Sequence, residues 1–181
     1  PMGSGKTHQL QLLMSKLNAI STRKRDSVLC ITFRVSLAFQ TATRLGLYCY
    51  RVDQTGRPSA AQRQLDERIK GDEIDRLCIC INSLSKLGTK EWDWIIFDEC
   101  GLIKDHLMAS ITTPQLPQIY PRLIASVKNA RHVILAQEFI SVSDVEFYMT
   151  MAGKEKDIYN ERVVSAYNYV RPSRIHDILH T

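Results

Sequence analysis

The feature that most constrains the fold of this chain is the run Pro-Met-Gly-Ser-Gly-Lys-Thr that opens it. Glycines in such a run let successive backbone N–H groups turn inward around a phosphate. The ammonium of Lys6 would reach the β- and γ-phosphates, and the hydroxyl of Thr7 would enter the coordination sphere of Mg²⁺. The run therefore predicts a nucleotide site at the start of a helix. The residues expected to bind the nucleotide are Met2, Gly3, Ser4, Gly5, Lys6, Thr7 and His8.

The residues after this run have the period of an amphipathic helix. Leu10, Leu13, Met14 and Leu17 recur at i, i+3, i+4 and i+7, so a helix is expected over 5–20. A Gly/Ser-rich tail would not be followed at once by such a pattern. The helix therefore favours a phosphate-binding loop over a tail.

A loop of this kind leaves the end of a buried parallel strand in the folds that use it. We therefore expect a central strand upstream of Pro1, which makes the sequence a fragment. The expected consequence is that the chain folds poorly alone and is rescued by an added upstream apolar segment. Thermal stability measured with and without that extension tests the expectation.

Apolar β-branched runs alternate with helix patterns along the rest of the chain. Strands are predicted over 27–33, 47–52, 76–81, 92–97 and 131–136. Helices are predicted over 34–45, 62–70, 101–110, 121–129 and 142–151. This alternation predicts an α/β fold with a parallel sheet and helices on both faces. We assign residues 1–156 to that domain and residues 157–181 to a β-rich connector towards another domain.

Composition narrows the class of protein only mildly. The net charge of +5 favours a polyanionic partner, although a bound nucleotide alone could account for it. The five cysteines form no Cys-x-x-Cys pair and three lie in strand-like runs, so buried reduced thiols are expected. Neither the cysteines nor the histidines have metal-ligand spacing, and no apolar stretch is long enough to span a membrane. We therefore expect no structural metal and no membrane partner.

Two carboxylates at the end of an apolar run are the second strong signal. Ile95-Ile96-Phe97 predicts a buried strand, and Asp98 and Glu99 follow it directly. Ligands of parallel α/β sheets bind at the carboxyl ends of the strands. Asp98 would hold Mg²⁺ there, and Glu99 would orient and deprotonate an attacking water. Acidic pairs also mark ordinary helix starts, but the phosphate-binding loop earlier in the chain favours the catalytic interpretation.

Four segments together resemble the helicases of superfamily 2. The opening loop, 32–40, 81–84 and Asp98-Glu99 are similar to motifs I, Ia, Ib and II of these enzymes. More narrowly, the loop, the run Phe-Arg-Val-Ser-Leu-Ala and the run Ile-Ile-Phe-Asp-Glu-Cys resemble replication origin-binding helicases of the herpesvirus type. The similarity covers residues 1–136. It implies a three-layer P-loop NTPase fold of the RecA-like kind, truncated before its first strand.

The resemblance also implies contacts with a single DNA strand. Arg34 and Ser36 would contact phosphates of that strand and Ser83 would contact another, because strand ends and helix starts present donors to phosphate. Arg34 could instead pair with a helical carboxylate, and Ser36 could serve to begin its helix. Gln137 follows the last strand without the Ser-Ala-Thr that usually forms motif III. It would sense the γ-phosphate or make a buried hydrogen bond.

From the residues that match these motifs, the resemblance implies that the chain is the ATP-binding lobe of an ATP-dependent DNA helicase. Such an enzyme binds and unwinds a replication origin. The catalytic residues would be Lys6, Asp98, Glu99 and Gln137, acting on ATP with Mg²⁺ held by Thr7 and Asp98. A second RecA-like lobe and a separate origin-recognition domain would complete the enzyme, so this chain alone would hydrolyse ATP very slowly. We expect it in the nucleus or cytoplasm, or at a site of viral replication.

Two other functions fit parts of the pattern. Thymidine kinases also use a Pro-Met-x-Ser-Gly-Lys loop and an Asp-Glu pair after a strand, but the paired zinc cysteines and lasso of that family are not found downstream. An inactive P-loop scaffold would not need an intact lysine, threonine and carboxylate pair. Nucleotide-dependent binding of single-stranded DNA separates the helicase from both, and phosphate transfer to thymidine would identify the kinase.

Overall fold

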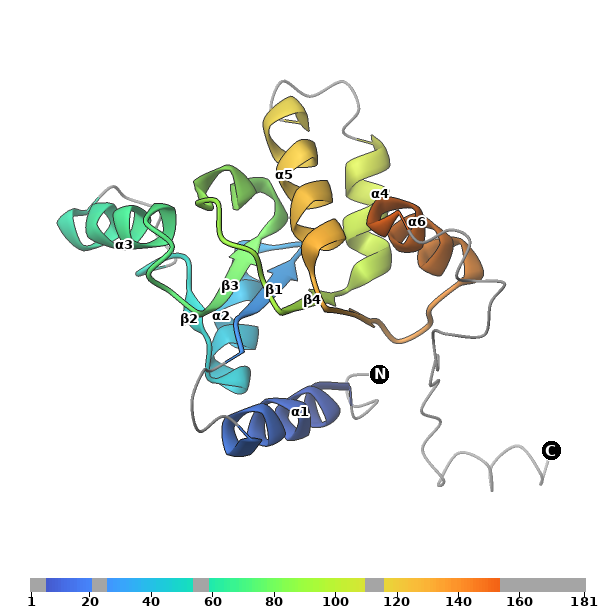
Figure 1. Ribbon diagram of the computed structural model, residues 1–181, viewed down its shortest axis with the longest axis horizontal. Coiled ribbons are helices and arrows are strands. Elements are labelled where there is room, and N and C mark those ends of the chain that lie inside the picture. Colours follow the sequence, from blue (N-terminus) through green and yellow to red (C-terminus); the bar gives the residue numbers. More distant parts are fainter. Residues whose placement is uncertain (1–5, 21–25, 54–58, 110–115, 154–181) are drawn as a thin grey trace.

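The strands form one parallel sheet of the kind expected from the alternating pattern. The computed structural model (Figure 1) describes residues 6–20, 26–53, 59–109 and 116–153. The strands are β1 (Val28–Thr32), β2 (Tyr48–Cys49), β3 (Arg76–Cys80), β4 (Trp94–Asp98) and β5 (His132–Ala136). They form a five-stranded sheet in the order β2-β3-β1-β4-β5, and every pairing is parallel. The predicted α/β fold is confirmed.

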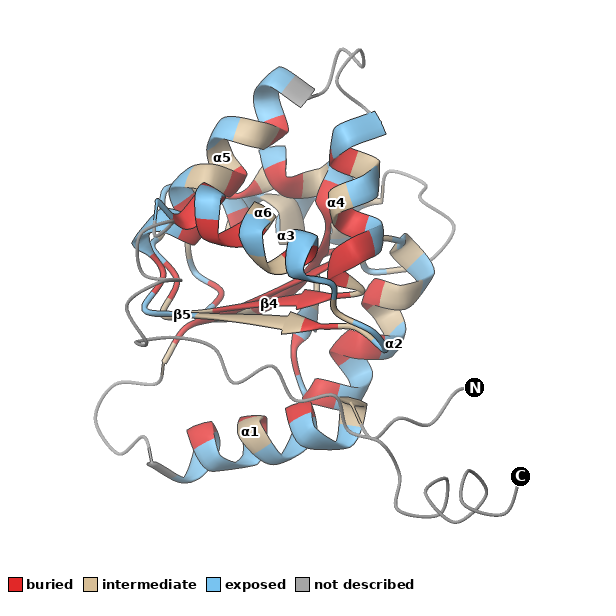
Figure 2. Ribbon diagram, turned by 90° about the vertical axis from the view of Figure 1, so that its right-hand side faces the viewer, coloured by how far each residue is buried: buried red, intermediate tan, exposed pale blue. Residues whose placement is uncertain are grey.

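Helices cover both faces of this sheet. They are α1 (Lys6–Ile20), α2 (Val35–Leu45), α3 (Ala60–Lys70), the 3₁₀ helix η1 (Ile81–Lys86), α4 (Cys100–Ala109), α5 (Leu116–Asn129) and α6 (Val142–Ala152). Figure 2 shows α1 and α2 on one side of the sheet and α4, α5 and α6 on the other, with the buried positions of each helix turned towards the strands. This is the three-layer arrangement of a RecA-like fold.

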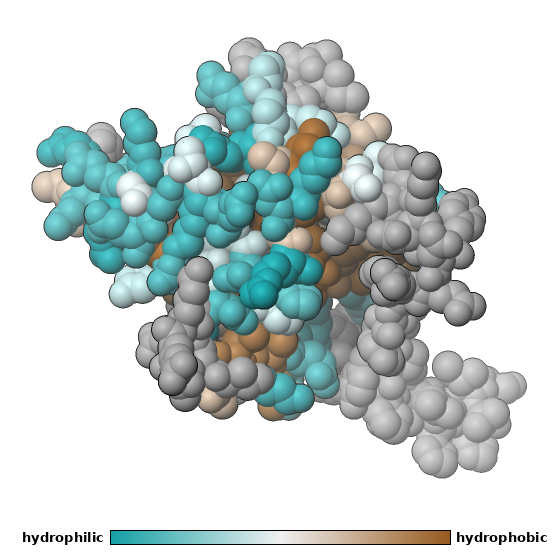
Figure 3. Space-filling model, in the orientation of Figure 1, coloured by the Kyte–Doolittle hydropathy of each residue, from teal (hydrophilic) through white to brown (hydrophobic). Residues whose placement is uncertain are grey.

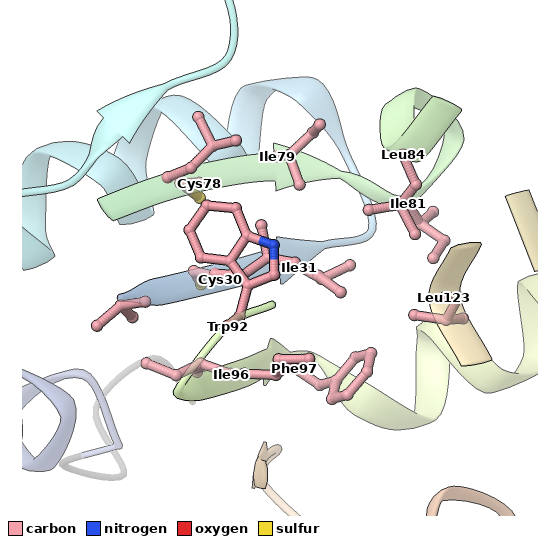
Figure 4. Close-up of a cluster of buried hydrophobic side chains, with 14 of the residues drawn as sticks. Cys30, Ile31, Cys78, Ile79, Ile81, Leu84, Trp92, Ile96, Phe97 and Leu123 are labelled. Carbon is pink, nitrogen blue, oxygen red and sulfur yellow. The ribbon is translucent and has the colours of Figure 1, made fainter. Parts of the chain in front are cut away.

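The central strands are buried on both faces, as parallel strands between two helix layers must be. Every residue of β1 is buried, and so are the last four residues of β3 and of β4. Figure 4 shows Ile31 and Ile79 side by side on neighbouring strands, with Leu123 of α5 facing the same cluster. Full burial of an aliphatic side chain contributes about 1.5–3 kcal/mol. The sheet and its two helix layers therefore share one apolar core.

The strands at the two ends of the sheet are less buried than the central ones. β5 is the outermost strand on one side, and of its residues only Ala136 is buried. Among the described residues no strand pairs with the outer edge of β5. At the other end, α3 packs against η1, and Figure 3 shows hydrophilic side chains over this end of the molecule. A further strand could extend the described sheet at the outer edge of β5.

Some element boundaries differ from the predicted ones. α5 begins at Leu116 rather than at Pro121, so this proline lies inside the helix. Because proline has no N–H, the carbonyl of residue 117 loses its hydrogen bond within the helix. Residues 81–86 form η1 instead of ending the third strand, and Trp92 precedes β4 as a buried loop residue. Residues 157–181, predicted as a connector, lie outside the described residues.

The thiols follow the prediction from composition. All five cysteines are free, four of them are buried, and Cys49 is half-buried. Burial raises the pKa of Cys100 to about 11, so this thiol stays protonated at neutral pH. In the part of the chain that the structure describes, no helix is long and apolar enough to cross a membrane.

A buried ion pair ties α4 to the start of α6. The Asp144 side chain accepts hydrogen bonds from the Ser141 backbone N–H at 2.9 Å and hydroxyl at 2.8 Å, and it pairs with Lys104. The Asp144 N–H in turn donates to the Ser141 Oγ at 3.1 Å, which completes a capping box. Burial by itself raises the pKa of Asp144, but the bonds from Lys104 and Ser141 outweigh it, so the pKa lies below its ordinary 3.8. The stabilisation is therefore complete above pH 3.8 and is lost as the pH falls towards the lower folded-state pKa.

We predict that Asp144→Asn lowers the free energy of unfolding by about 1–2 kcal/mol at pH 7 and flattens its decline below pH 4. Urea unfolding followed by circular dichroism from pH 7 to pH 3 measures both effects. Asp105→Asn, at an exposed carboxylate on α4, is the matched control and should change little. Equal losses in the two variants at pH 7 would contradict the assignment.

Candidate functional site

The predicted phosphate-binding lysine and the predicted carboxylate pair meet at one point. Lys6 is the first residue of α1, Asp98 ends β4, and Glu99 connects that strand to α4. The Lys6 Nζ lies 3.4 Å from the Asp98 Oδ1 and forms a closer ion pair with the Glu99 Oε1. Side-chain exposures are 21% for Lys6, 10% for Asp98 and 32% for Glu99, so the site is sheltered but open to solvent on the Glu99 side.

Electrostatics keep Lys6 charged in this position. Burial by itself lowers the pKa of Lys6, because it disfavours the ammonium. The hydrogen bond to Glu99 and the negative charges of Asp98 and Glu99 raise it by more, so the pKa lies above its ordinary 10.5. The site therefore presents a fixed positive charge beside two carboxylates at every physiological pH.

Asp98 is oriented from the opposite side by a helix. The Thr41 hydroxyl of α2 donates a hydrogen bond of 2.8 Å to the Asp98 Oδ2, and both residues are buried. One carboxylate oxygen is thus fixed by α2, while the other faces Lys6. Sequence analysis missed this role of Thr41. The available signal was a hydroxyl on the apolar side of the helix predicted over 34–45.

Gln137 contacts the residues that follow Glu99. It follows β5, and its Oε1 accepts hydrogen bonds from the Gly101 backbone N–H and, at 3.4 Å, from the Cys100 thiol. A Cβ on Gly101 would displace the Gln137 amide from its present position. Gln137 is half-buried and makes these hydrogen bonds at the first turn of α4, and its expected role at the γ-phosphate stays a prediction.

The donor set suits magnesium held together with phosphates. Mg²⁺ prefers oxygen ligands and is commonly bound through one or two carboxylates, waters and substrate phosphates. Asp98 and Glu99 supply such oxygens, and the partly exposed Thr7 follows Lys6 in the first turn of α1. Within the described ranges no three His, Cys, Asp or Glu side chains gather as a cage that could hold a metal by itself. The residues fit an ion shared with a bound triphosphate.

The other predicted nucleotide residues are placed as follows. His8 is exposed and lies in α1 directly after Lys6 and Thr7. Met2, Gly3, Ser4 and Gly5 lie outside the described residues, so their predicted contacts with phosphate stay predictions.

The residues predicted to contact DNA lie after neighbouring strands. Arg34 occupies the N-cap position of α2 after β1, and Ser36 lies in the first turn of that helix; both are exposed. Ser83 lies in η1 after β3, where it is half-buried and shares a hydrogen bond with the Tyr50 hydroxyl. Because β1 and β3 are paired in parallel, all three residues lie at the carboxyl edge of the sheet, as Asp98 does.

Side chains that sequence analysis missed join these segments. The Arg34 guanidinium lies over the Phe33 ring, 5.5 Å from its centroid, and the ring of His106 packs edge-on against Phe33 at 5.4 Å. The His106 Nε2 lies 2.7 Å from the Asn82 Oδ1 of η1. Asn82, unlike Ser83, is exposed, so it is the more accessible side chain of η1. No local sequence signal placed His106 beside these two segments.

Comparison with known proteins gives one family. Residues 1–174 match a protein-family model described as origin of replication binding protein. Curated proteins give no match. The matched region includes Lys6 in α1, the two carboxylates after β4 and the residues at the carboxyl edge of β1 and β3.

Proposed function

This chain belongs to the family of origin of replication binding proteins, and from that premise we propose that it is the ATP-binding lobe of an ATP-dependent DNA helicase acting at replication origins. The observation that carries the proposal is the meeting of Lys6 with both Asp98 and Glu99 at the carboxyl ends of the strands. This is where a triphosphate would bind in a parallel α/β fold.

Each residue of the site has a defined task in this proposal. Lys6 exchanges its carboxylate partners for the β- and γ-phosphates, and Thr7 with Asp98 would hold Mg²⁺, which neutralises phosphate charge when bound. Thr41 keeps Asp98 in its orientation through the 2.8 Å hydrogen bond. Glu99, the more exposed carboxylate, orients a water and takes its proton as the water attacks the γ-phosphate. Gln137, which contacts Cys100 and Gly101 directly after Glu99 in the chain, is the candidate sensor of the γ-phosphate.

The surface at the carboxyl edge of β1 and β3 is proposed to hold one DNA strand. Arg34 supplies a charge that makes no ion pair with any carboxylate of the described residues, and Ser36 supplies an exposed hydroxyl. Such contacts with phosphate position a strand without reading its sequence. Base recognition would then belong to a separate origin-recognition domain.

A second RecA-like lobe is proposed to complete the motor. Arginine fingers supplied by a partner raise the turnover of phosphoryl-transfer enzymes by ~10³–10⁵. This chain by itself should therefore bind Mg·ATP and hydrolyse it very slowly. Its free thiols suit a reducing compartment, and we propose that the protein acts in the nucleus or cytoplasm.

The proposal is tested by nucleotide-dependent binding of single-stranded DNA. Fluorescence anisotropy of a labelled oligonucleotide is measured with Mg²⁺ alone, with Mg·ADP and with a slowly hydrolysed Mg·ATP analogue. We expect the affinity for DNA to differ between the two nucleotides. The helicase proposal would be overturned if the affinity for DNA were the same with and without either nucleotide, or if the chain transferred phosphate to thymidine.

A point variant tests the strand-binding surface separately. We predict that Arg34→Ala weakens binding of single-stranded DNA about fivefold, which is about 1 kcal/mol, because one contact with a phosphate is lost. The slope of log affinity against log salt concentration should fall by ~0.7. Arg63→Ala, at an exposed position of α3, is the control and should change neither value. An unchanged salt slope in Arg34→Ala would remove this residue from the surface.

A further inference from the structure

Glu99, the carboxylate proposed to act on the attacking water, has an unusual backbone conformation. Glu99 has φ of +64°, in the left-handed region that residues other than glycine rarely adopt. Such a conformation persists only where the surrounding structure holds it, and it is concentrated at functional sites. What holds the turn between β4 and α4 therefore decides where the Glu99 carboxylate lies.

Backbone and side-chain contacts from β5 hold one side of this turn. The Glu99 N–H donates a hydrogen bond of 2.8 Å to the Ala136 carbonyl at the end of β5. The Gly101 N–H, two residues further, donates to the Gln137 side chain. Hydrogen bonds therefore hold this segment at Glu99 itself and at the start of α4.

A buried tyrosine from α6 holds the other side. The Tyr148 hydroxyl donates a hydrogen bond of 2.8 Å to the carbonyl of Cys100, the residue directly after Glu99. Tyr148 is only 2% exposed, and its ring packs against Phe97 with centroids 4.4 Å apart. Burial raises the pKa of Tyr148 well above its ordinary value, so the hydroxyl stays protonated and remains a donor.

We propose that Tyr148 is a positioning residue for ATP hydrolysis, acting through the Cys100 carbonyl to keep Glu99 in its left-handed conformation. The inference rests on the proposed function, because it concerns the carboxylate assigned there to the attacking water. Tyr148 contacts neither nucleotide nor metal in this account. Its hydroxyl should therefore affect the rate of the chemical step and leave nucleotide binding by Lys6 and Thr7 alone.

The test is Tyr148→Phe, which removes the hydroxyl and keeps the ring. The full chain, in excess over γ-labelled ATP and with saturating Mg²⁺, is followed through a single turnover, so that slow hydrolysis is still measurable. We expect the rate constant per folded molecule to fall about tenfold, because a small displacement of the Glu99 carboxylate lowers the rate of the chemical step strongly. The dissociation constant of a fluorescent ATP analogue should stay within about twofold of that of the unaltered chain.

Two matched variants separate positioning from simple structural support. Tyr120→Phe removes a hydroxyl from a half-buried tyrosine of α5 and should leave the rate unchanged. Phe147→Leu loosens the ring that packs edge-on against Tyr148 at 5.1 Å, without touching the hydroxyl. It should lower the melting temperature, with the rate per folded molecule unchanged.

The outcomes are distinguishable. An unchanged rate in Tyr148→Phe would overturn the positioning role and leave the proposed function standing. A rate that falls together with nucleotide affinity, or an equal loss of rate in Phe147→Leu, would show a structural role only and also overturn it. If the unaltered chain fails to bind or hydrolyse ATP, the proposed function itself is wrong and the positioning role falls with it.

Discussion

Replacing Lys6 with alanine is expected to abolish binding of Mg·ATP, lowering the affinity by at least ~100-fold, which corresponds to about 2.7 kcal/mol. Among the ion pairs of the described residues, the Lys6 ammonium is the group of α1 that contacts Asp98 and Glu99. These two side chains stabilise its positive charge. Hydrogen bonds to charged groups contribute about 1.5–3 kcal/mol each, and a triphosphate would take more than one from this group. Titration with a fluorescent ATP analogue measures the loss.

The fold should survive this substitution. Lys6 is the first residue of α1, whereas the buried positions that attach this helix are Leu10, Met14 and Leu17. Lys16→Ala, at an exposed position of the same helix, is the matched control and should bind the nucleotide as the unaltered chain does. Unchanged affinity in Lys6→Ala, with the fold verified by circular dichroism, would place the nucleotide site elsewhere.

The second large effect is expected from Glu99→Gln. Glutamine keeps the size of the side chain and can still accept a hydrogen bond from Lys6, but it cannot take a proton from water. A positioned general base contributes ~10²–10⁴ in rate, so single-turnover hydrolysis should fall by at least ~100-fold. Nucleotide affinity should change by less than about threefold, because Glu99 acts in the chemical step rather than in binding.

Controls for this variant are available on the same chain. Glu146→Gln removes an exposed carboxylate of α6 and should leave hydrolysis unchanged. If Glu99→Gln hydrolyses ATP within about twofold of the rate of the unaltered chain, Glu99 is not the base. Asp98, already engaged by Thr41 and Lys6, would then be the remaining carboxylate of the pair to examine.

The framework of the fold was predictable from local sequence. Apolar β-branched runs fixed the positions of the strands within two or three residues, because a strand buried on both faces admits few polar side chains. The buried β1 and β4 illustrate this. The helix predicted over 34–45 ends at Gly46, which adopts the left-handed conformation with φ of +66°. The convergence of Lys6 with Asp98 and Glu99 was also predictable, because parallel strands end at one edge of their sheet.

The contacts that orient the site could not be predicted in the same way. Thr41, Tyr148 and the Gln137–Gly101 bond join elements that are adjacent only after the layers have packed. A threonine on a helix face and a tyrosine on another have many possible partners. The left-handed conformation of Glu99 has the same cause, since glutamate has no local preference for it.

At the proposed DNA surface the contacts with phosphate stay predictions, and the structure shows how far each residue is exposed. Arg34 and Ser36 are exposed after β1, as a contact with phosphate requires. Ser83 faces Tyr50 and is half-buried, while its neighbour Asn82 is exposed and contacts His106. The difference arises because residues 81–86 turn as a 3₁₀ helix, which changes the side chain that faces outward.

The central claim is that α1 and the carboxylates after β4 enclose a single Mg·triphosphate. A crystal structure of the full chain with Mg²⁺ and a non-hydrolysable ATP analogue tests it most directly. We predict the β- and γ-phosphates within hydrogen-bond distance of the Lys6 Nζ, and Mg²⁺ bonded directly or through water to Thr7 and Asp98. A nucleotide bound away from the N-terminus of α1, or a metal ion beyond water-bridged reach of Asp98, would contradict the account.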